Sequence, residues 1–356
     1  MSELTPNPAF MHRCLELAAL GRGRVGNGAL VGAVLVRHGK IIGEGFHAAY
    51  GEAHAERALL DAFNGQVLPE DVLYVNLEPC CHQGKTPPCT NILIERGVKT
   101  IVYGMVDPDP RVTGKGIAHL IQSGVKVVGP FDRELCENLN KGFIQVRKNQ
   151  RPYITVKKAV SSDGKIANHD GSPMKITSKE QDTWSHRFLR ARHDAILVGV
   201  GTVITDNPQL NIRFDQTNDI SLMEGLNRNI FRSKNSIQPY RVILDPAMKI
   251  SLDAKVVSDA QASRTILCVT PEAADREQGK VAVLQKRGVR IVRIPLQGDH
   301  FDWEALWRAL ITPVEDYHGL TSILVEGGEK TWEVFKKAGF MNEEVILTGK
   351  LFKDLP

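Results

Sequence analysis

Residues 77–89 read LEPCCHQGKTPPC and place three cysteines, one histidine and a Gly-Lys-Thr triplet within one short segment. Cysteine and histidine bind metal ions, cysteines also form disulfides, and Gly-Lys-Thr occurs in loops that bind nucleotide phosphates. The chain has 356 residues and only six cysteines, whereas disulfide scaffolds are short, cysteine-dense and secreted. The composition therefore argues against a disulfide knot.

The Gly-Lys-Thr triplet lacks the spacing of an ATP-binding loop. That motif needs a glycine five positions before Gly84, and Pro79 occupies the position. Residues 21–26, GRGRVG, match the dinucleotide-binding pattern by letter. They follow a helix-like segment and precede a strand-like one, which is the reverse of the order that this fingerprint requires.

The remaining possibility is a metal site, and its other half lies upstream in residues 51–63, GEAHAERALLDAF. The spacing of apolar residues in this segment is typical of a helix. The predicted buried face contains Ala55, Leu59, Ala62 and Phe63. The segment therefore places an H-x-E motif at the beginning of a helix.

His54, Glu56, the Pro79-Cys80 pair and Cys89 match the H-x-E and P-C…C signature of zinc deaminases. In that signature the histidine and two cysteines bind zinc, and the glutamate transfers protons without ligating. Three protein ligands leave the fourth tetrahedral position to a water, whose pKa zinc lowers to about 7. Glu56 would take a proton from this water and pass protons to a ring nitrogen and to the departing ammonia.

Two neighbouring residues leave the ligand set open. Cys81 is a rival thiolate ligand, and His82 is a candidate fourth ligand that would close the site and make it structural. The usual cysteine spacing in zinc deaminases is P-C-x-x-C, whereas eight residues separate Cys80 from Cys89 here. A zinc-stabilised binding module without catalysis is therefore an alternative, although it would have no use for Glu56.

Charge and hydropathy limit the location and the partners. The 45 basic and 41 acidic residues give a formal charge of +4, without a basic run. The N-terminus has no basic region followed by an apolar run, and residues 195–204 form one of the longest apolar stretches, which is shorter than the roughly 18 to 20 residues of a membrane span. This charge neither requires nor excludes nucleic acid and is compatible with a small anionic substrate. We expect a cytoplasmic protein with no membrane partner and predict no nucleic-acid partner.

Three segments together resemble one family: GEAHAE (51–56), EPCCHQGKTPPC (78–89) and DPDPRVTGKG (107–116). They resemble the deaminase half of the bifunctional riboflavin-biosynthesis deaminase/reductases. The resemblance implies zinc at His54, Cys80 and Cys89, and deamination of a phosphoribosylated pyrimidine. It also implies substrate contacts from His47, His82, Lys85, Thr86 and Asp107. A lysine and a threonine hydroxyl suit a ribose phosphate.

A second domain is expected after the polar segment KNQRP at residues 148–152. We place the deaminase domain at residues 1–148 and a reductase domain at 149–356. Beyond residue 153, strand-like and helical segments alternate, which is typical of an α/β domain with a largely parallel sheet. Strand-like segments lie at 153–160, 194–204, 240–245, 265–269, 289–294 and 322–328, and helical segments at 178–192, 276–287 and 328–338.

Two of these strands run into glycines, ILVGVGT at 196–202 and ILVEGG at 323–328. The second continues directly into a helix, whose N-terminal amides are free to bind an anion. One such strand end is often a simple turn, but two in one α/β domain favour a site for a dinucleotide pyrophosphate.

The second half resembles the reductase domain of the same family, through KKAVSSDGKIA (157–167), ITS (176–178), residues 189–213 and VEGG (325–328). The resemblance implies a dihydrofolate-reductase-like fold, NADPH as cofactor, reduction of a ribosyl group to ribityl, and a homo-oligomer (dimer or tetramer). Implied cofactor contacts are Lys157, Ala159, Thr202, Asp206, Gly327 and Gly328. Implied substrate contacts are Arg190, Leu210, Arg213 and Glu326.

Several positions depart from the family pattern. Gly28-Ala29 replaces a usual Asn-Pro, and Asp109 replaces an asparagine. Pro173 and Lys175 stand where serine and tryptophan are typical, and the sequence ends at LTGKLFKDLP. These departures leave one alternative open, a deaminase for another nucleobase or nucleoside with a second domain that binds but does not reduce.

Overall fold

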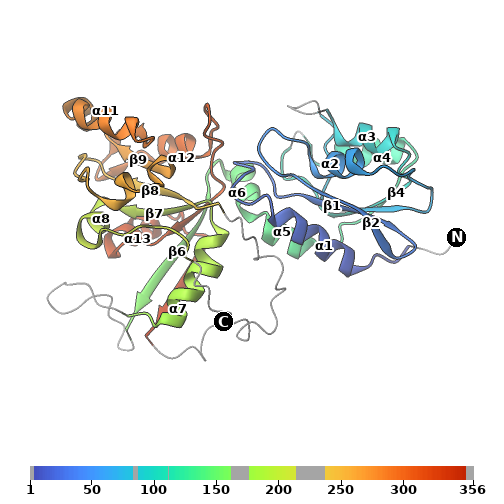
Figure 1. Cartoon of the computed structure of the whole chain (residues 1–356), viewed down its shortest axis with the longest axis horizontal. Coiled ribbons are helices and arrows are strands. Elements are labelled where there is room, and N and C mark those ends of the chain that lie inside the picture. Colours follow the sequence, from blue (N-terminus) through green and yellow to red (C-terminus); the bar gives the residue numbers. More distant parts are fainter. Residues whose placement is uncertain (1–3, 83–86, 111, 162–175, 214–236, 350–356) are drawn as a thin grey trace. The chain divides into compact units, whose positions relative to one another are not determined.

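The computed structural model describes residues 4–82, 87–110, 112–161, 176–213 and 237–349 (Figure 1). Contacts divide the described chain into two compact units, and we describe each by itself. The first unit contains the described residues up to Gln150 together with Pro313–His318. The second unit contains the described residues from Arg151 to Thr312 and from Gly319 onward.

The first unit is built on a five-stranded sheet with the order β2-β1-β3-β4-β5. Its strands are β1 (Gly32–Arg37), β2 (Lys40–Phe46), β3 (Val72–Leu77), β4 (Thr100–Met105) and β5 (Lys126–Val128). β1 pairs antiparallel with β2 and β3, whereas β3, β4 and β5 run parallel. Consequently β3 and β4 end at the same edge of the sheet, and the chain leaves both strands there.

Helices cover both faces of this sheet. They are α1 (Pro8–Ala19), α2 (Ala55–Ala62), α3 (Cys89–Glu95), α4 (Lys115–Gln122), α5 (Arg133–Leu139) and α6 (Lys141–Asn149). Figure 1 shows α2, α3 and α4 on one face and α1 and α5 on the other. Strand β1, which lies between β2 and β3, is buried from Gly32 to Val36. This is expected for a strand covered on both faces, and its sequence over these residues is a continuous apolar run.

The α2 helix packs directly on β2, because Gly45 has no side chain. A Cβ atom at Gly45 would lie 2.5 Å from both the Ala55 carbonyl oxygen and the Leu59 amide nitrogen. Ala55, Leu59 and Leu60 are the buried apolar residues of α2. The prediction that Ala62 is buried is wrong, because the buried stripe passes through Leu60 and the helix ends at Ala62, which is exposed.

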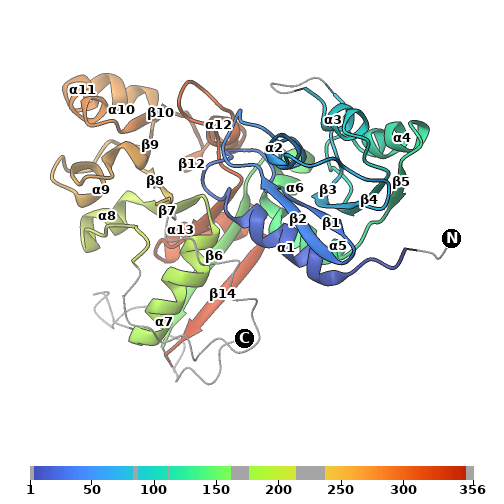
Figure 2. The ribbon, with the colours of Figure 1, turned by 45° about the vertical axis from the view of Figure 1, so that its right-hand side comes forward.

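The second unit contains a seven-stranded sheet with the order β10-β9-β8-β7-β13-β6-β14, in which every pairing is parallel. These strands are β6 (Tyr153–Val160), β7 (Ala195–Gly199), β8 (Tyr240–Leu244), β9 (Thr265–Val269), β10 (Arg290–Arg293), β13 (Ser322–Val325) and β14 (Glu343–Thr348). Figure 2 shows β14 beside β6 at one edge. The predicted α/β domain with a largely parallel sheet is confirmed.

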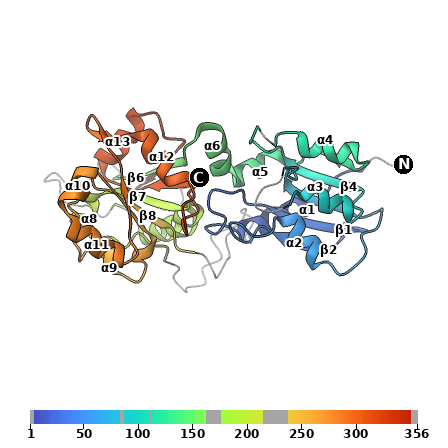
Figure 3. The same ribbon diagram turned by 90° about the horizontal axis from the view of Figure 1, so that it is seen from above.

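The helices of the second unit also lie on both faces of its sheet. They are α7 (Lys179–Trp184), α8 (Val200–Asp206), α9 (Lys255–Ser258), α10 (Pro271–Arg276), α11 (Gln278–Lys286), α12 (Trp303–Ile311) and α13 (Glu329–Lys337), with short helical turns η1 (Ser185–Leu189), η2 (Arg190–Arg192) and η3 (Ala262–Arg264). A separate two-stranded ribbon pairs β11 (Leu296–Gln297) with β12 (His300–Phe301). Figure 3 shows α12 and α13 on one side of the strands and α8, α9 and α11 on the other.

One predicted strand is too long. Residues 194–204 were expected to be extended throughout, but β7 ends at Gly199 and α8 begins at Val200. The valine and isoleucine residues of this segment continue across the boundary, so hydrophobicity alone gives no sign of it. The described part of the chain contains no helix with the length and apolar character needed to cross a membrane.

The packing of α2 on β2 predicts that Gly45→Ala destabilises the first unit by about 2 kcal/mol, since the methyl group forces the helix away from the strand. Gly43→Ala in the same strand is the matched control, because a Cβ there would meet the Leu59 side chain at an ordinary 3.5 Å. Urea denaturation of both variants checks this. Equal free energies of unfolding would contradict the close approach.

Candidate metal and cofactor sites

His54, Cys80 and Cys89 form the one cluster of potential metal ligands found among the described residues, with all ligand atoms within 4.8 Å of one another. The His54 Nδ1 atom lies 3.5 Å from the Cys80 Sγ atom and 3.4 Å from the Cys89 Sγ atom. Tetrahedral zinc, with Zn–N of ~2.0 Å and Zn–S of ~2.3 Å, needs a nitrogen–sulfur separation of roughly 3.5 Å. The donor atoms therefore fit zinc. Cys81 and His82 are described but lie outside the cluster.

Local structure positions these three side chains. His54 is the residue before α2, Cys80 follows β3, and Cys89 opens α3 directly after Pro88. The backbone N–H of Cys89 donates to the Cys80 Sγ atom at 3.3 Å. Hydrogen bonds from the Cys89 thiol and from His54 lower the pKa of the Cys80 thiol. The cluster thus favours a thiolate before any metal charge is considered.

Glu56 lies in the first turn of α2 and is only 3% exposed. Burial, and then the negative charge of Cys80, raise the pKa of the Glu56 carboxyl group to about 7. A carboxyl group with a pKa near neutrality can both accept and donate protons under physiological conditions. Its position beside the two thiols is the position that proton transfer at a metal site requires.

Two further residues predicted to contact substrate are buried, and one of them, His47, lies beside the cluster. His47 is buried, its ring centroid lies 5.4 Å from that of His54, and its Nε2 atom has no hydrogen-bond partner among the described residues. Burial, and then the charge of His54, lower the pKa of His47. An orphaned buried nitrogen of this kind is costly unless a ligand satisfies it. The Asp107 side chain is also buried, and burial raises its pKa to about 6.

The remaining predicted contacts of this half are placed differently. The His82 side chain is exposed, and Lys85 and Thr86 lie outside the described residues. The unusual Asp109 is buried with its carboxylate 4.0 Å from the Arg147 guanidinium, so its charge has a counter-charge. A Cβ atom at Gly28 would lie 3.7 Å from the His47 ring, so Gly28 borders the same site.

Glu78 is a residue that the sequence analysis missed. It follows β3, is 2% exposed, and accepts four backbone N–H groups with its carboxylate. The donors are Asp107 (3.2 Å), Gly114 (3.0 Å), Gly116 (3.0 Å) and Ile117 (3.3 Å). Glu78 therefore holds the segment from Asp107 to α4 next to the residues that follow β3, which include Cys80. A carboxylate directly after a buried strand was the available signal.

In the second unit, the two glycine-bearing strand ends lie side by side. β7 and β13 are neighbouring parallel strands, and the Glu326 N–H donates to the Leu197 carbonyl at 3.0 Å. Gly199 precedes α8 and Gly328 precedes α13. A Cβ atom at Gly327 would lie 2.6 Å from the Thr331 Cβ atom, so only glycine fits this turn. Two helix N-termini at one edge of the sheet favour the binding of an anion there.

A pocket of about 310 Å³ lies at the end of α8. Its lining residues are Arg190, Asp206, Asn207, Pro208, Gln209, Leu210, Asn211, Arg213 and Lys255. Four of these had been predicted from sequence as substrate or cofactor contacts: Arg190, Asp206, Leu210 and Arg213. Of the other predicted contacts, Thr202 lies on α8, Lys157 and Ala159 on β6, and Gly327 and Gly328 at the end of β13, outside this lining.

Arg190 and Glu326 form a largely buried two-point ion pair, with nitrogen–oxygen distances of 2.7 and 2.6 Å. Burial opposes ionisation of Glu326, but the charge of Arg190 outweighs it and lowers the pKa of Glu326 to about 2. The Nη1 atom of Arg190 donates to the Asn211 carbonyl at 2.8 Å. Arg190 thus holds Asn211 in place, and Glu326 compensates most of the positive charge of Arg190.

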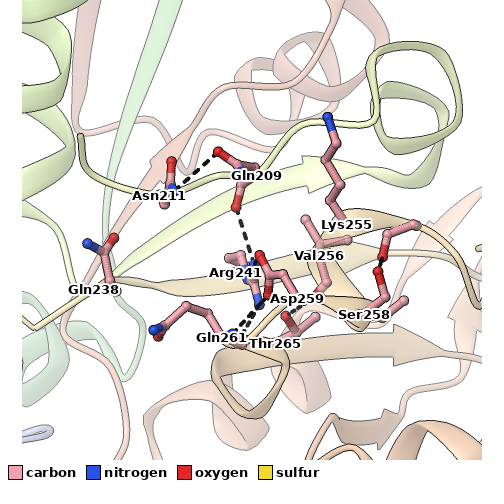
Figure 4. Close-up of polar contacts among 12 residues, drawn as sticks. Gln209, Asn211, Gln238, Arg241, Lys255, Val256, Ser258, Asp259, Gln261 and Thr265 are labelled. Carbon is pink, nitrogen blue, oxygen red and sulfur yellow. Dashed lines mark hydrogen bonds and ion pairs between the residues drawn. The ribbon is translucent and has the colours of Figure 1, made fainter.

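The pocket segment at residues 209–211 is also fixed by a hydrogen bond from Arg241, as Figure 4 shows. Arg241 on β8 is 1% exposed; it donates to the Gln209 carbonyl at 3.3 Å and to both carboxylate oxygens of Asp259, at 2.8 and 3.0 Å. Leu210, which lies between Gln209 and Asn211, has a left-handed φ of 48°. A strained residue of this kind persists only where its surroundings fix it.

The chain matches two family models, one in each half. The model of the cytidine and deoxycytidylate deaminase zinc-binding region matches residues 5–105, and that of the RibD C-terminal domain matches residues 152–349. The chain is 37% identical to riboflavin biosynthesis protein RibD of Aquifex aeolicus, covering 95% of this chain and 85% of that protein. It is 34% identical to RibD of Actinobacillus pleuropneumoniae, covering 94% and 81%.

Solved structures agree with these matches. Acinetobacter baumannii RibD superimposes with a TM-score of 0.76 at 30% identity, covering 96% of this chain and 85% of that one. The diaminohydroxyphosphoribosylaminopyrimidine deaminase/5-amino-6-(5-phosphoribosylamino)uracil reductase of Thermotoga maritima gives 0.74 at 33% identity, covering 97% and 87%.

The fold and the sites define a zinc-dependent deaminase of the cytidine-deaminase-like fold joined to a dihydrofolate-reductase-like reductase. The chain belongs to the RibD family of riboflavin-biosynthesis proteins. It is therefore a bifunctional enzyme with deaminase and reductase activities, and its cofactors are zinc and NADPH. The fold, family and cofactors predicted from sequence are confirmed, and the alternative function is not favoured.

The contacts of Glu78 predict a specific defect in Glu78→Gln. An amide nitrogen in place of one carboxylate oxygen would face two backbone N–H groups, so the segment from Asp107 to α4 loses its anchor. We expect deaminase kcat/KM to fall by about tenfold or more, on the order expected for losing hydrogen bonds to a buried charge.

Zinc content and reductase activity should stay unchanged in this variant. Exposed Glu95 on α3 provides the control, and Glu95→Gln should behave as the unmodified enzyme. Loss of zinc from Glu78→Gln would instead assign Glu78 to the integrity of the metal site.

Proposed function

We propose that residues 1–148 hydrolytically deaminate 2,5-diamino-6-(5-phosphoribosylamino)pyrimidin-4-one, and that residues 149–356 then reduce the ribosyl group of the product to ribityl with NADPH. The observation that carries the proposal is the cluster of His54, Cys80 and Cys89 with Glu56 buried beside it. The name of the Thermotoga relative supports this choice of substrates.

In the deamination, His54, Cys80 and Cys89 would hold the zinc ion. Bound zinc supplies a Lewis acid that makes water nucleophilic near neutral pH. Glu56 takes a proton from the attacking water, delivers one to the ring nitrogen, and then protonates the amino group that leaves as ammonia. Water and the 2-amino group are consumed, and a ring carbonyl and ammonia are formed.

Other residues of the first unit bind and orient the pyrimidine. The unpaired Nε2 atom of His47 suits a polar group of the ring, and buried Asp107 suits a ring N–H. His82, Lys85 and Thr86 would hold the ribose phosphate, in keeping with their residue types.

In the reduction, the chain would bind NADPH at the ends of β7 and β13. NADPH supplies the hydride for C1′ of the ring-opened ribose. The N-terminal amides of α13, after Gly327 and Gly328, suit the pyrophosphate. Further cofactor contacts are assigned to Lys157, Ala159, Thr202 and Asp206.

The substrate of the reductase would occupy the pocket at the end of α8. Arg213 lines the pocket, is exposed, and has no carboxylate partner among the described residues, so it suits the substrate phosphate. Leu210 lines the same pocket. The Arg190–Glu326 pair supplies fixed polar groups that orient the substrate. A cytoplasmic location and a homo-oligomeric assembly stay predictions from the sequence.

Glu56→Gln tests the deaminase. The amide cannot transfer protons, so we expect turnover to fall by a factor of about 10² to 10⁴ while zinc and fold are retained. The ligand set is checked by metal analysis, in which Cys80→Ser should lose zinc and Cys81→Ser should keep it. Unchanged turnover in Glu56→Gln would remove Glu56 from the mechanism.

Titration of NADPH followed by addition of deaminated substrate tests the reductase. We expect cofactor binding and then oxidation in proportion to substrate added. Pro173 and Lys175 lie outside the described residues. Binding without oxidation would mean a second domain that binds but does not reduce, and absence of binding would refute the assignment of the cofactor site.

A further inference from the structure

His186 contacts Arg190 and Arg213, the two arginines that line the pocket at the end of α8, and no sequence motif singles it out. It belongs to a single π-helical turn, η1 (Ser185–Leu189), which connects α7 to Arg190. Such turns are rare and occur frequently at functional sites. The turn buries the His186 ring and places it against the side chains of Arg190 and Arg213.

The contacts of the ring fix which nitrogen carries the proton. The backbone N–H of Arg213 points at the His186 Nδ1 atom at 3.1 Å. Because a backbone amide can only donate, Nδ1 must accept, and the proton of the neutral ring resides on Nε2. The Nε2 atom lies 3.3 Å from a guanidinium nitrogen of Arg213 and 3.5 Å from one of Arg190.

Three hydrogen-bond donors therefore meet at one point, and guanidinium groups cannot accept. Burial, and then the charges of Arg190 and Arg213, lower the pKa of His186 to about 4. The ring is accordingly neutral near pH 7 and adds no third positive charge between the arginines. Glu326 and Asp182 face the same ring with the opposite effect on its pKa. Of these donors, the guanidinium group of Arg213 lines the pocket and has no carboxylate partner among the described residues, so it suits the oxygen atoms of an anion.

His186 does not line the pocket, whereas Arg190 and Arg213 do. We propose that His186 is a positioning residue for a phosphate monoester: it holds the backbone of Arg213 through Nδ1 and thereby keeps the Arg213 guanidinium group directed at one anionic group. This inference rests on the proposed function, in which Arg213 binds the substrate phosphate.

The experiment compares the reductase KM for the deaminated phosphorylated substrate with that for its dephosphorylated counterpart. His186→Leu removes both ring nitrogens. His186→Asn keeps an acceptor close to the position of Nδ1, whereas His186→Gln places its amide near the position of Nε2. Arg213→Gln reports on the phosphate contact itself. His193→Asn is the matched control, because His193 is a buried histidine of the same unit with contacts to Leu189 and Thr155.

We expect His186→Leu and His186→Gln to raise the KM of the phosphorylated substrate by about tenfold, the size expected for losing one hydrogen bond that orders a charged group. The KM of the dephosphorylated substrate and the affinity for NADPH should stay within about twofold. His186→Asn should restore most of the loss, and His193→Asn should leave the ratio of the two KM values unchanged. If His186→Leu does not fold, the comparison of His186→Asn with His186→Gln tests the inference in its place.

Three outcomes overturn the inference: equal losses on both substrates, equal behaviour of the Asn and Gln variants, or ¹⁵N NMR resonances of His186 with the proton on Nδ1. These are distinct from failure of the proposed function. If Arg213→Gln does not distinguish the two substrates, the phosphate assignment is wrong and the inference falls with it. If Arg213→Gln distinguishes them and the His186 variants do not, only the inference falls.

Discussion

Parallel strands end at a common edge of their sheet, and both candidate sites of this chain depend on that constraint. In the first unit, β3 and β4 deliver Glu78, Cys80 and Asp107 to one edge. In the second unit, β7 and β13 deliver Gly199 and the segment after Val325 to one edge. Functional groups that are far apart in sequence are thereby brought together by the sheets before any side chain is considered.

The buried ionisable groups around the two sites are of two kinds. Glu78 is satisfied by four backbone N–H groups, and the Arg190–Glu326 and Arg241–Asp259 pairs satisfy each other. Such groups hold loops in place. Removing one partner would leave an uncompensated buried charge, which is strongly destabilising. Glu56 and His47 differ, since one is buried with a raised pKa and the other keeps an unpaired nitrogen. The second kind is suited to proton transfer and ligand binding, and it stands beside the metal cluster.

The fold, and the close approach of His54, Cys80 and Cys89, could be predicted from the sequence because both rest on local patterns. The H-x-E motif opens a helix, and a proline pair precedes the helix that Cys89 begins. Positions whose role depends on distant partners were missed. Glu78 acts through a segment that begins 29 residues later, His186 through Arg213 at a separation of 27, and Arg241 through Asp259 at 18. The end of β7 was missed because valine and isoleucine continue into α8.

The pairing of Arg190 with Glu326 has a consequence for how an anion reaches the pocket at the end of α8. Because that guanidinium is neutralised at close range, the long-range attraction arises mainly from the exposed side chains of Arg213 and Lys255, opposed by Asp206. Charges in contact with solvent are screened within about 8 Å at physiological ionic strength. Capture of an anion is therefore sensitive to salt, whereas the buried ion pair that shapes the pocket is screened much less. The rate of entry and the shape of the binding surface are thus governed by different arginines.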